Sequence, residues 1–450
     1  MVGSTRSVTI DGRTWIPGEN LGHESRQKIY RDLRISQTVE NSFGFGDPVE
    51  VDLLKIKDEM FGVPREYGKQ FIGNGNAVKD LRSNGEDRDF KFHGMLKDKQ
   101  GSLVQTMLDE LRHRSEGGIL QSPCGSGKTV MALKIIQELG GTVLIVVHKE
   151  FLMTQWAEQI QKFLKIKPGF IQQNVCEFEN KSIVIGMVHS LVMRTYPIRL
   201  YRWPRTVLYD EVHRMAAPMF QKVIGRFPSK YRIGLSATPK RKDGLDNVFL
   251  WNIGQVVAKS EERKVIPKVF MIRVPMDINM AGTIGWNGKL LLARVINRIA
   301  ENPLRNEWVV KQLIKAVAAG RKVLVLSDRL AQLRWIHDRF LIKYEGEGVK
   351  VGFYIGGMHA DKRKESEGCN LLLGTFQMAK EGMDIPELDT LLLATPKTDV
   401  EQAAGRILRE VSGKRKPMVV DLVDSMQVMR AFAGKRFKQY KKLRYDVEWR

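Results

Sequence analysis

Residues 118–129 read GILQSPCGSGKT, a short apolar segment followed by a loop that ends in Lys128 and Thr129. The apolar segment predicts a buried strand, and the apolar periodicity of residues 130–139 predicts a helix after the loop. In this setting the backbone N–H groups of the loop and the N-terminus of the helix can face phosphate oxygens. We therefore predict a phosphate-binding loop. It consists of Ser122, Pro123, Cys124, Gly125, Ser126, Gly127, Lys128 and Thr129.

Several positions in this loop have a defined chemical role. Gly125 and Gly127 allow the backbone to bend toward the phosphates. Lys128 is expected to neutralise the β- and γ-phosphates, and the hydroxyl of Thr129 is expected to hold Mg²⁺. The strict pattern of such loops begins with glycine, whereas this loop begins with Ser122, which is another small residue.

A second candidate site lies in residues 207–213, VLYDEVH. The apolar residues predict a strand, and ligands bind at the carboxyl ends of strands in a parallel sheet. Asp210 is expected to hold Mg²⁺ together with Thr129, and Glu211 is expected to orient and deprotonate the attacking water. His213 is a candidate for coupling this site to the other lobe.

Short apolar runs alternate with helical patterns in two parts of the chain, which is typical of parallel sheets wrapped by helices. The predicted strands are residues 118–121, 143–147, 183–187, 206–209 and 231–235, then 268–274, 322–326, 351–355, 370–373, 390–394 and 417–423. The predicted fold class is therefore α/β, with two tandem parallel-sheet lobes. The predicted domains are an N-terminal accessory domain at residues 1–90, lobe 1 at 91–260 and lobe 2 at 261–450.

The composition favours a polyanionic partner. The 450 residues include 73 Lys and Arg against 51 Asp and Glu, a formal net charge of +22. Residues 1–90 hold 13 basic and 15 acidic side chains, so the positive charge belongs to the part with the motifs, and nucleic acid is the first candidate. We expect neither a membrane span nor a secretory signal. The three cysteines form no C-x-x-C pair, which favours reducing, cytoplasmic surroundings.

The ordered set of motifs resembles the superfamily 2 helicases of the D-E-x-H kind, here with a DEVH box, over about residues 95–425. This resemblance implies two RecA-like lobes. Residues 96–100, LKDKQ, resemble the segment whose glutamine recognises adenine, which implies ATP as the nucleotide and Gln100 as its contact. Residues 235–239, LSATP, resemble the motif that links hydrolysis to movement. Their continuation at 240–244, KRKDG, is more similar to XPB-like, RecG-like and phage UvsW-like branched-DNA helicases than to DEAD-type RNA helicases.

The second lobe carries the remaining motifs. Residues 374–386, GTFQMAKEGMDIP, resemble motif V, and residues 402–409, QAAGRILR, resemble motif VI. The spacing of the two arginines in motif VI predicts that both lie on one face of a helix, from which they reach the γ-phosphate. The resemblance adds to the ATP site Gly382 and Asp384, and as catalytic residues Gln402, Arg406 and Arg409.

The resemblance also implies residues that couple hydrolysis to movement and residues that hold the nucleic acid. The coupling residues are His213, Ser236, Ala237 and Thr238. The contacts to the sugar–phosphate backbone are Lys149, Ser190, Arg329, Thr375 and Gln377. Such contacts make binding salt-dependent and largely independent of base sequence.

Three further features have no role in these motifs. Candidates for base-stacking platforms or a strand-separating wedge are Trp156, Trp203, Trp286 and Phe376, although most aromatic side chains belong to cores. Residues 430–444 contain seven basic side chains and no acid, and they predict a helix that docks on lobe 2 and touches DNA with its basic face. Residues 1–90 either recognise a junction in the substrate or brace lobe 1.

The leading hypothesis is an ATP-hydrolysing DNA helicase or translocase that acts as a monomer on forked and branched DNA, with ATP and Mg²⁺. Branch migration or fork reversal would connect it with DNA replication, recombination and repair, in the host cytoplasm if the chain comes from a phage. The alternatives are an RNA helicase, the motor subunit of a restriction or nuclease assembly, and a nucleic-acid clamp without catalysis. The complete set of ATPase residues argues against the clamp.

Overall fold

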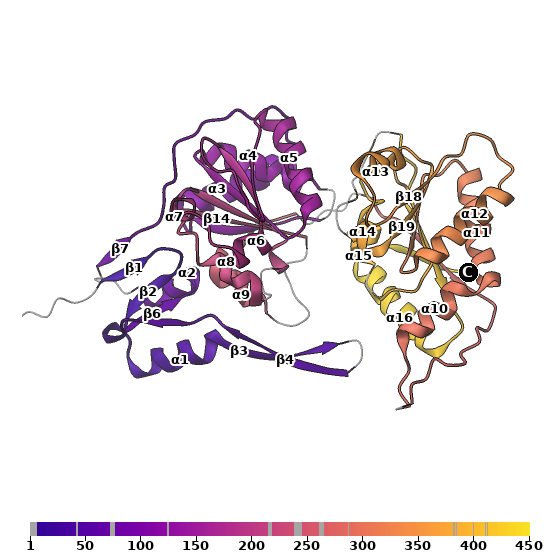
Figure 1. The fold of residues 1–450 in the computed structure, drawn as a ribbon, viewed down its shortest axis with the longest axis horizontal. Helices are drawn as coiled ribbons and strands as arrows, with labels where there is room; N and C mark the ends of the chain where they lie inside the picture. The colour runs from indigo at the N-terminus through magenta and orange to yellow at the C-terminus, as the bar shows by residue number, and fades with distance from the viewer. Residues whose placement is uncertain are drawn as a thin grey trace, which may run out of the picture. The chain divides into compact units, whose positions relative to one another are not determined.

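The computed structural model describes residues 7–41, 44–72, 77–123, 126–214, 218–237, 245–260, 265–286, 288–380, 383, 385–398, 400–409, 411 and 413–450. The chain folds as two compact units, Met1–Glu261 and Glu262–Arg450. In Figure 1 the colours of the first unit run from indigo to magenta, and those of the second unit run to yellow.

The first unit is built on a large parallel sheet. Its strand order is β11-β10-β12-β9-β13-β14-β8-β15, and each neighbouring pair except β10 and β11 is parallel. The central strands are apolar at successive positions because they are covered on both faces. The strands are β8 (Gly117–Gln121), β9 (Val143–Val147), β10 (Gly169–Gln172), β11 (Val175–Cys176), β12 (Ile183–Met187), β13 (Thr206–Asp210), β14 (Tyr231–Ser236) and β15 (Val256–Lys259).

Helices cover both faces of this sheet. Ile145 of β9 packs into the core that includes α3, α4 and α5, whereas its neighbours Leu144 and Val146 pack with α6 to α9. This division follows from the alternation of side chains along a strand. Figure 1 shows α4 and α5 on one side of the sheet and α8 and α9 on the other. The helices are α3 (Asp98–His113), α4 (Lys128–Leu139), α5 (Glu150–Leu164), α6 (Val188–Met193), α7 (Ile198–Arg202), η3 (Val212–Arg214), α8 (Pro218–Ile224) and α9 (Asp246–Ile253).

A smaller β-rich region precedes this sheet within the first unit. Its sheet has the order β5-β6-β2-β1-β7, and β3 and β4 form a separate antiparallel hairpin. The elements are β1 (Val8–Ile10), β2 (Thr14–Pro17), η1 (Gly18–Asn20), α1 (His23–Leu33), β3 (Arg34–Asn41), β4 (Gly44–Asp52), β5 (Lys55–Lys57), β6 (Met60–Val63), α2 (Arg65–Gly68), η2 (Lys69–Phe71) and β7 (Val78–Asp80).

The N-terminal region docks directly on the rest of the first unit. Its apolar core includes Leu245 and Val248, at the start of α9. Gly12 also approaches the backbone after α8 so closely that a Cβ at this position would lie 2.1 Å from the carbonyl oxygen of Gly225. These contacts agree with a bracing role for the N-terminal region. The domain boundary near residue 90 stays a prediction.

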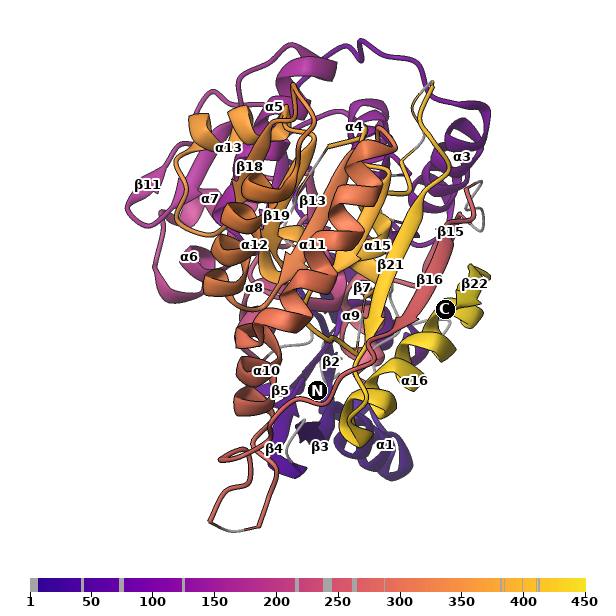
Figure 2. The same cartoon turned by 90° about the vertical axis from the view of Figure 1, so that its right-hand side faces the viewer.

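The second unit repeats the parallel architecture. Its strand order is β18-β19-β17-β20-β21-β16-β22, and all neighbouring pairs are parallel. Figure 2 shows α11 and α12 in front of this sheet, where they share an apolar core with it. The strands are β16 (Lys268–Arg273), β17 (Val323–Ser327), β18 (Val351–Tyr354), β19 (Leu371–Thr375), β20 (Thr390–Leu393), β21 (Met418–Val423) and β22 (Asp446–Trp449). The helices are α10 (Leu292–Glu301), α11 (Pro303–Ala318), α12 (Leu330–Lys343), α13 (Ala360–Glu367), α14 (Phe376–Lys380), α15 (Glu401–Gly405) and α16 (Gln427–Lys442).

The observed architecture confirms the predicted α/β fold with two RecA-like lobes, because each predicted strand has a counterpart in one of the two parallel sheets. The predicted C-terminal helix is α16, which docks through Tyr440 and partly buried Phe437. Within the two large sheets, four short strands have no predicted counterpart, namely β10, β11, β15 and β22, and none of the strands β1 to β7 of the N-terminal region is predicted. None of the helices in the described part of the chain combines the length and apolar character that a membrane span requires.

Candidate active site

The phosphate loop joins the carboxyl end of β8 to the N-terminus of α4, as the sequence predicts. Cys124 and Gly125 lie outside the described residues. Gly127 caps α4 with a φ of 87°, in the left-handed region that favours glycine. A Cβ at Gly127 would also lie 2.5 Å from Nε2 of Gln100. The backbone conformation therefore favours glycine at this position, and a larger residue would also displace the amide of Gln100.

Hydrogen bonds hold the described part of the loop in place. Gln100 donates from Nε2 to the carbonyl oxygen of Ser126 at 2.8 Å. The hydroxyls of Ser122 and Ser126 lie 2.5 Å apart, and Ser126 Oγ donates to the carbonyl oxygen of Pro123 at 2.6 Å. The backbone N–H of Ser122 donates to the carbonyl oxygen of Ser236 at 3.0 Å, which ties the loop to β14. Gln100, the predicted adenine contact, thus braces the phosphate loop in this structure.

Lys128 begins α4, and its ammonium nitrogen is buried without a hydrogen-bond partner among the described residues. It faces Oε1 of Glu211 at 3.8 Å. Glu211 directly follows β13 and has a φ of 55°, which is uncommon for a residue with a side chain. Thr129 lies next to Lys128 in the first turn of α4. A buried ammonium group without hydrogen bonds is costly unless a ligand supplies them, so this geometry suits an anionic phosphate.

Asp210 ends β13, and its Oδ2 accepts a hydrogen bond from the indole N–H of Trp156 at 3.1 Å. Burial and, second, the charge of Glu211 raise the pKa of Asp210 to about 6. A divalent cation at this carboxylate would favour its charged form. The hydrogen bond by which Trp156 orients Asp210 could not be predicted from the sequence, because no motif indicates a contact between these two positions.

His213 and Ser236 connect the carboxylate site to the end of β14. Nδ1 of His213 lies 3.3 Å from Oε2 of Glu211 and 3.3 Å from Oγ of Ser236. Ala237 follows β14 directly, and Thr238 lies outside the described residues. Because β14 lies between β13 and β8 in the sheet, these contacts form a short path between the carboxylates and the phosphate loop. The coupling role of these residues stays a prediction.

Motif VI in the second unit differs from the sequence prediction. Helix α15 ends at Gly405, so that Gln402 lies within the helix whereas Arg406 is its C-cap and Arg409 lies beyond it. The prediction that both arginines lie on a helix is therefore wrong. Glycine is a poor helix former, which explains why the helix ends there.

Contacts with motif V hold Arg406 after the end of this helix. Its guanidinium donates to the carbonyl oxygens of Ala379 at 2.6 Å and Met383 at 2.9 Å. Gly382 and Asp384, which the sequence analysis assigns to the ATP site, lie outside the described residues. The structure thus brings motifs V and VI together within the second unit.

The predicted backbone contacts lie on different elements of the two units. Lys149 is the N-cap of α5, after β9, and Thr375 ends β19. Gln377 is exposed in α14. Ser190 lies in α6 and is buried, and its hydroxyl accepts a hydrogen bond from the backbone N–H of residue 173 at 2.8 Å. Their roles in nucleic-acid binding stay predictions.

Arg329, the remaining predicted contact, is attached to α10. Its Nε donates to Oδ1 of Asn297 at 2.5 Å, and a terminal nitrogen donates to the carbonyl oxygen of Ala293 at 3.3 Å. These bonds orient the guanidinium of Arg329 beside α10. Its nucleic-acid role also stays a prediction.

The candidate stacking residues divide into two groups. Trp156, Trp203 and Phe376 are buried, so their rings are not available to stack on a base. Trp286 is 105% exposed. Burial therefore rules out three of the four stacking candidates and leaves Trp286.

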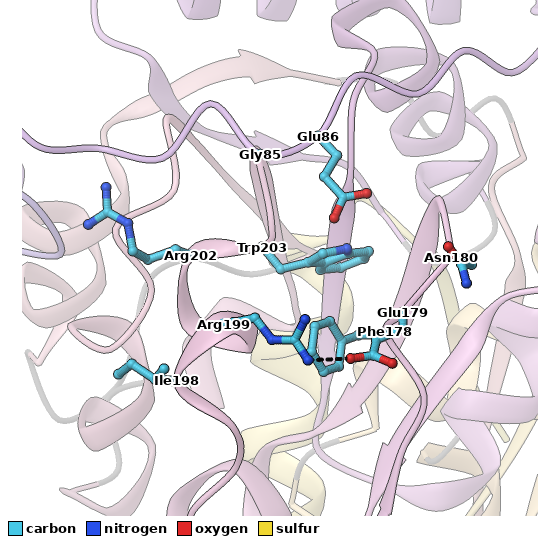
Figure 3. Close-up of a pocket in the computed structure, with 9 residues that line it drawn as sticks. All are labelled: Gly85, Glu86, Phe178, Glu179, Asn180, Ile198, Arg199, Arg202 and Trp203. Carbon is cyan, nitrogen blue, oxygen red and sulfur yellow. Dashed lines mark hydrogen bonds and ion pairs between the residues drawn. The ribbon is translucent and has the colours of Figure 1, made fainter.

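A separate cavity of about 700 Å³ lies at the opposite end of the first parallel sheet. Its lining residues precede β12 and β13, whereas the phosphate and carboxylate residues follow their strands. Figure 3 shows Arg199 and Glu179 in this cavity, where they form an ion pair at 2.7 Å. The lining consists of Gly85, Glu86, Phe178, Glu179, Asn180, Ile198, Arg199, Arg202 and Trp203. None of these residues belongs to the candidate active site.

Comparison with known families and proteins relates the chain to helicases. Residues 93–241 match the family model described as the type III restriction enzyme, res subunit. The chain is 30% identical over 448 residues to the putative ATP-dependent RNA helicase L396 of Acanthamoeba polyphaga mimivirus, with 96% of this chain and 85% of that protein covered. It is 29% identical over 433 residues to the putative helicase 161L of Invertebrate iridescent virus 6, with coverage of 88% and 91%.

Two further comparisons extend this result. The chain is 27% identical over 315 residues to the probable helicase D10 of Escherichia phage T5, with 68% of this chain and 67% of that protein covered. The crystal structure of T4 UvsW aligns over 99% of both chains with 16% identity and a TM-score of 0.40, and at that score the likeness carries no conclusion. The near full-length similarity to the mimivirus helicase and the ordered motifs decide the family. This chain belongs to the superfamily 2 helicases, which couple ATP hydrolysis to work on nucleic acids.

Proposed function

We propose that this chain is an ATP-driven DNA translocase that unwinds and remodels forked and branched DNA, by branch migration and fork reversal. The observation that carries the catalytic part is the buried ammonium of Lys128, which lies at the end of a phosphate loop, has no hydrogen-bond partner among the described residues and is 3.8 Å from Glu211. This pair combines a cation for the phosphates with a base for the attacking water.

The described residues fit ATP and Mg²⁺. The ammonium of Lys128 and the N-terminus of α4 would bind the phosphates, and the carboxylate of Glu211 would orient a water and take its proton. Mg²⁺ held by the oxygens of Thr129 and Asp210, a donor type that this ion prefers, would neutralise phosphate charge. The residues that we assign to the stabilisation of the γ-phosphate are Gln402, Arg406 and Arg409.

Sequence and fold both support the choice of a branched DNA substrate. The continuation of the LSATP motif resembles branched-DNA enzymes, and residues 91–450 carry an excess of basic side chains that suits a sequence-independent grip on phosphates. The N-terminal region is packed against α9, so it adds a second fixed surface to the first unit. We propose that this surface contacts the junction while the monomer moves along one strand.

An RNA helicase is the second candidate. The observation that favours it is the 30% identity to the mimivirus protein, which is described as a putative ATP-dependent RNA helicase. The family model's description as a restriction-enzyme subunit favours a third candidate, a motor that acts together with a nuclease chain. The substrate decides between the first two candidates, and the need for a partner chain identifies the third.

The test is ATP hydrolysis by the full chain with single-stranded DNA, blunt duplex, forked DNA, four-way junctions and RNA strands of matched length, each at two salt concentrations. We expect the highest rates with forks and junctions and lower stimulation at higher salt. Lys128→Ala serves as the control that hydrolysis arises from this site. Equal stimulation by RNA strands and DNA junctions would contradict the DNA assignment, and a fully active Lys128→Ala protein would contradict the ATP site.

A further inference from the structure

One hairpin of the second unit carries an unusual set of exposed apolar side chains. Trp286 is 105% exposed, and Ile284 and Leu290 are exposed on the same hairpin. Ile284 and Leu290 pair in an antiparallel bridge, and Trp286 lies two residues beyond Ile284 in the turn of the same hairpin. We call these three residues the apolar hairpin face. Their exposure to water is unfavourable, which points to a ligand that covers them.

Backbone hydrogen bonds connect the described residues of the two arms of this hairpin. Gly285 N–H donates to the carbonyl oxygen of Lys289 at 2.8 Å, and Gly288 N–H donates to that of Gly285 at 2.9 Å. At the base, Leu291 N–H donates to the carbonyl oxygen of Thr283 at 2.7 Å. A ligand at the apolar hairpin face therefore meets arms that are already paired in the described residues.

The surroundings of the hairpin are positively charged. Residues 278–300 contain Lys289, Arg294 and Arg298 and no Asp or Glu, although Asp277 and Glu301 lie directly outside this range. Arg294 donates to the carbonyl oxygen of residue 282 at 2.9 Å, and Arg298 donates to that of residue 281 at 3.1 Å. These bonds fix both guanidinium groups against the hairpin base, and their partners are neutral, so the positive charge remains available to an anionic ligand.

A second basic surface belongs to the same structural unit. Val295 and Ile299 of α10 share an apolar core with Met429 of α16. Figure 2 shows α10 and α16 at the same end of the second unit as the hairpin. The exposed basic side chains of α16 include Lys435 and Lys438, one helical turn apart.

We propose that the apolar hairpin face and the adjoining basic side chains bind single-stranded nucleic acid. An unpaired base stacks on Trp286, and the phosphates of the same strand contact Arg294, Arg298 and the exposed lysines of α16. Stacking on an aromatic side chain requires a free base face, which a base inside a duplex does not offer. This inference rests on the proposed function and names the surface that holds the unpaired strand. Arg329, a predicted backbone contact, is hydrogen-bonded to α10 and so belongs to the same region.

The test measures binding of the full chain to a fluorescent single strand and to a hairpin duplex with closed ends. Trp286→Ala is expected to weaken binding of the single strand by roughly 5- to 150-fold, the range for loss of one stacked base. The Trp286→Phe protein retains an aromatic ring and is expected to bind within a few fold of the parent. Ile342→Ala on α12 is the matched control, because Ile342 is an exposed apolar residue elsewhere in this unit, and its affinity is expected to equal that of the parent.

A base analogue placed in the strand tests the stacking directly. 2-Aminopurine fluorescence is expected to be quenched by the parent and by Trp286→Phe, but not by saturating Trp286→Ala. The double variant Lys435→Gln, Lys438→Gln is expected to reduce the slope of log affinity against log salt by about 1.4, which is about 0.7 for each lost phosphate contact. A Trp286→Ala protein that binds the single strand as tightly as the parent would overturn the proposal and indicate that the hairpin face contacts a protein instead. If the parent neither binds nucleic acid nor shows stimulated ATP hydrolysis, the proposed function itself fails.

Discussion

In the first unit, Arg65 and Arg232 are buried mainly against backbone carbonyls, whereas in the second unit Arg305 and Arg436 are buried against carboxylates. Arg305 binds both carboxylate oxygens of Asp424 at 2.6 and 3.1 Å. Arg436 binds those of Asp421 at 2.8 and 2.7 Å. The two units thus use related parallel sheets but different means of accommodating buried charge.

The difference in hydrogen-bond partners follows from the segments of the chain that each guanidinium connects. In the first unit, Arg232 donates to the carbonyl oxygens of Gly12 at 2.8 Å, Asn252 at 2.9 Å, and Ile224 and Phe227 at 3.1 Å each. It therefore connects the N-terminal region to the segments around α8 and α9 without neutralisation of its charge. In the second unit the pairs lie on and after β21, where they hold helices on one sheet.

The same contrast in pairing is seen in the pKa values. Burial and, second, the charge of Arg232 lower the pKa of Arg65 to about 9. Burial also lowers the pKa of Arg232. For Arg436, burial acts in the same direction, but the charge and hydrogen bonds of Asp421 raise its pKa above the usual value. Arg232 thus keeps a buried charge without an ion pair among the described residues, and Arg65 has only a long one to Glu66 at 4.0 Å, whereas the second unit has close bidentate pairs.

The largest expected effect concerns catalysis and results from a change in the first unit. Glu211→Gln removes the base that faces Lys128 and is expected to lower ATP turnover by about 10²- to 10⁴-fold. Nucleotide binding is expected to persist, because the phosphate loop is unchanged. Steady-state hydrolysis and binding of a fluorescent ATP analogue measure the two quantities. Turnover within a few fold of the parent would show that another group activates the water.

The next largest effect is a loss of stability that we expect in the second unit and not in the first. Asp421→Ala leaves Arg436 buried without its carboxylate and removes the acceptor of the Tyr440 hydroxyl, so we expect a loss of about 3–5 kcal/mol in the stability of the second unit. Hydrogen exchange followed by mass spectrometry is expected to show faster exchange in β21 and α16, with β9 and β14 unchanged. The double variant Asp421→Leu, Arg436→Met is the control and is expected to recover part of the loss, because no buried charge remains.

A smaller effect is expected from the corresponding change in the first unit. Arg232→Met removes a buried charge but leaves several carbonyls without donors, and we expect a net loss of about 1–3 kcal/mol. Faster hydrogen exchange should appear in β1, β2 and α9 and not in the second unit. Faster exchange throughout the chain would contradict a local bracing role for Arg232.

The smallest effect concerns Lys414 in the second unit. Like Arg232 in the first unit, this cation has backbone carbonyl oxygens as its hydrogen-bond partners. Its ammonium donates to the carbonyl oxygens of Pro386 at 2.7 Å and Arg409 at 2.8 Å, and burial lowers its pKa to about 8. The unfolded chain then binds more protons than the folded chain between about pH 8 and 10.5, so the parent gains stability relative to Lys414→Met as pH rises through this window. Urea unfolding of both proteins at pH 7.5 and 9.5 measures the difference, which we expect to stay under about 1 kcal/mol because solvent screens this charge. A difference that does not change with pH would contradict the lowered pKa.

The predictable parts of the fold are those with strong local patterns. Strands such as β9 and β17 are buried on both faces and appear as uninterrupted apolar runs. The edge strand β22 reads DVEW, with charged residues that give no such signal, and it pairs with β16 from a distant part of the chain. Its existence depends on tertiary contacts that no local pattern encodes.

The candidate active site shows the same limit. Lys128, Asp210 and Glu211 could be predicted because each belongs to a motif that follows a strand. The hydrogen bond from Trp156 to Asp210 joins positions 54 residues apart, and that from Arg232 to Gly12 joins positions 220 residues apart. Contacts of this kind follow from the packing of whole elements, so a single sequence does not indicate them.

The close approach of Gly12 to Gly225 has a consequence for the comparison of relatives. Because even a methyl group at position 12 would collide with a main-chain oxygen, a homologue that carries a larger residue there must either shift its N-terminal strands or lack this attachment. The residue at this one position can therefore serve as a marker, readable from a gene alone, of which related motors share the same N-terminal arrangement.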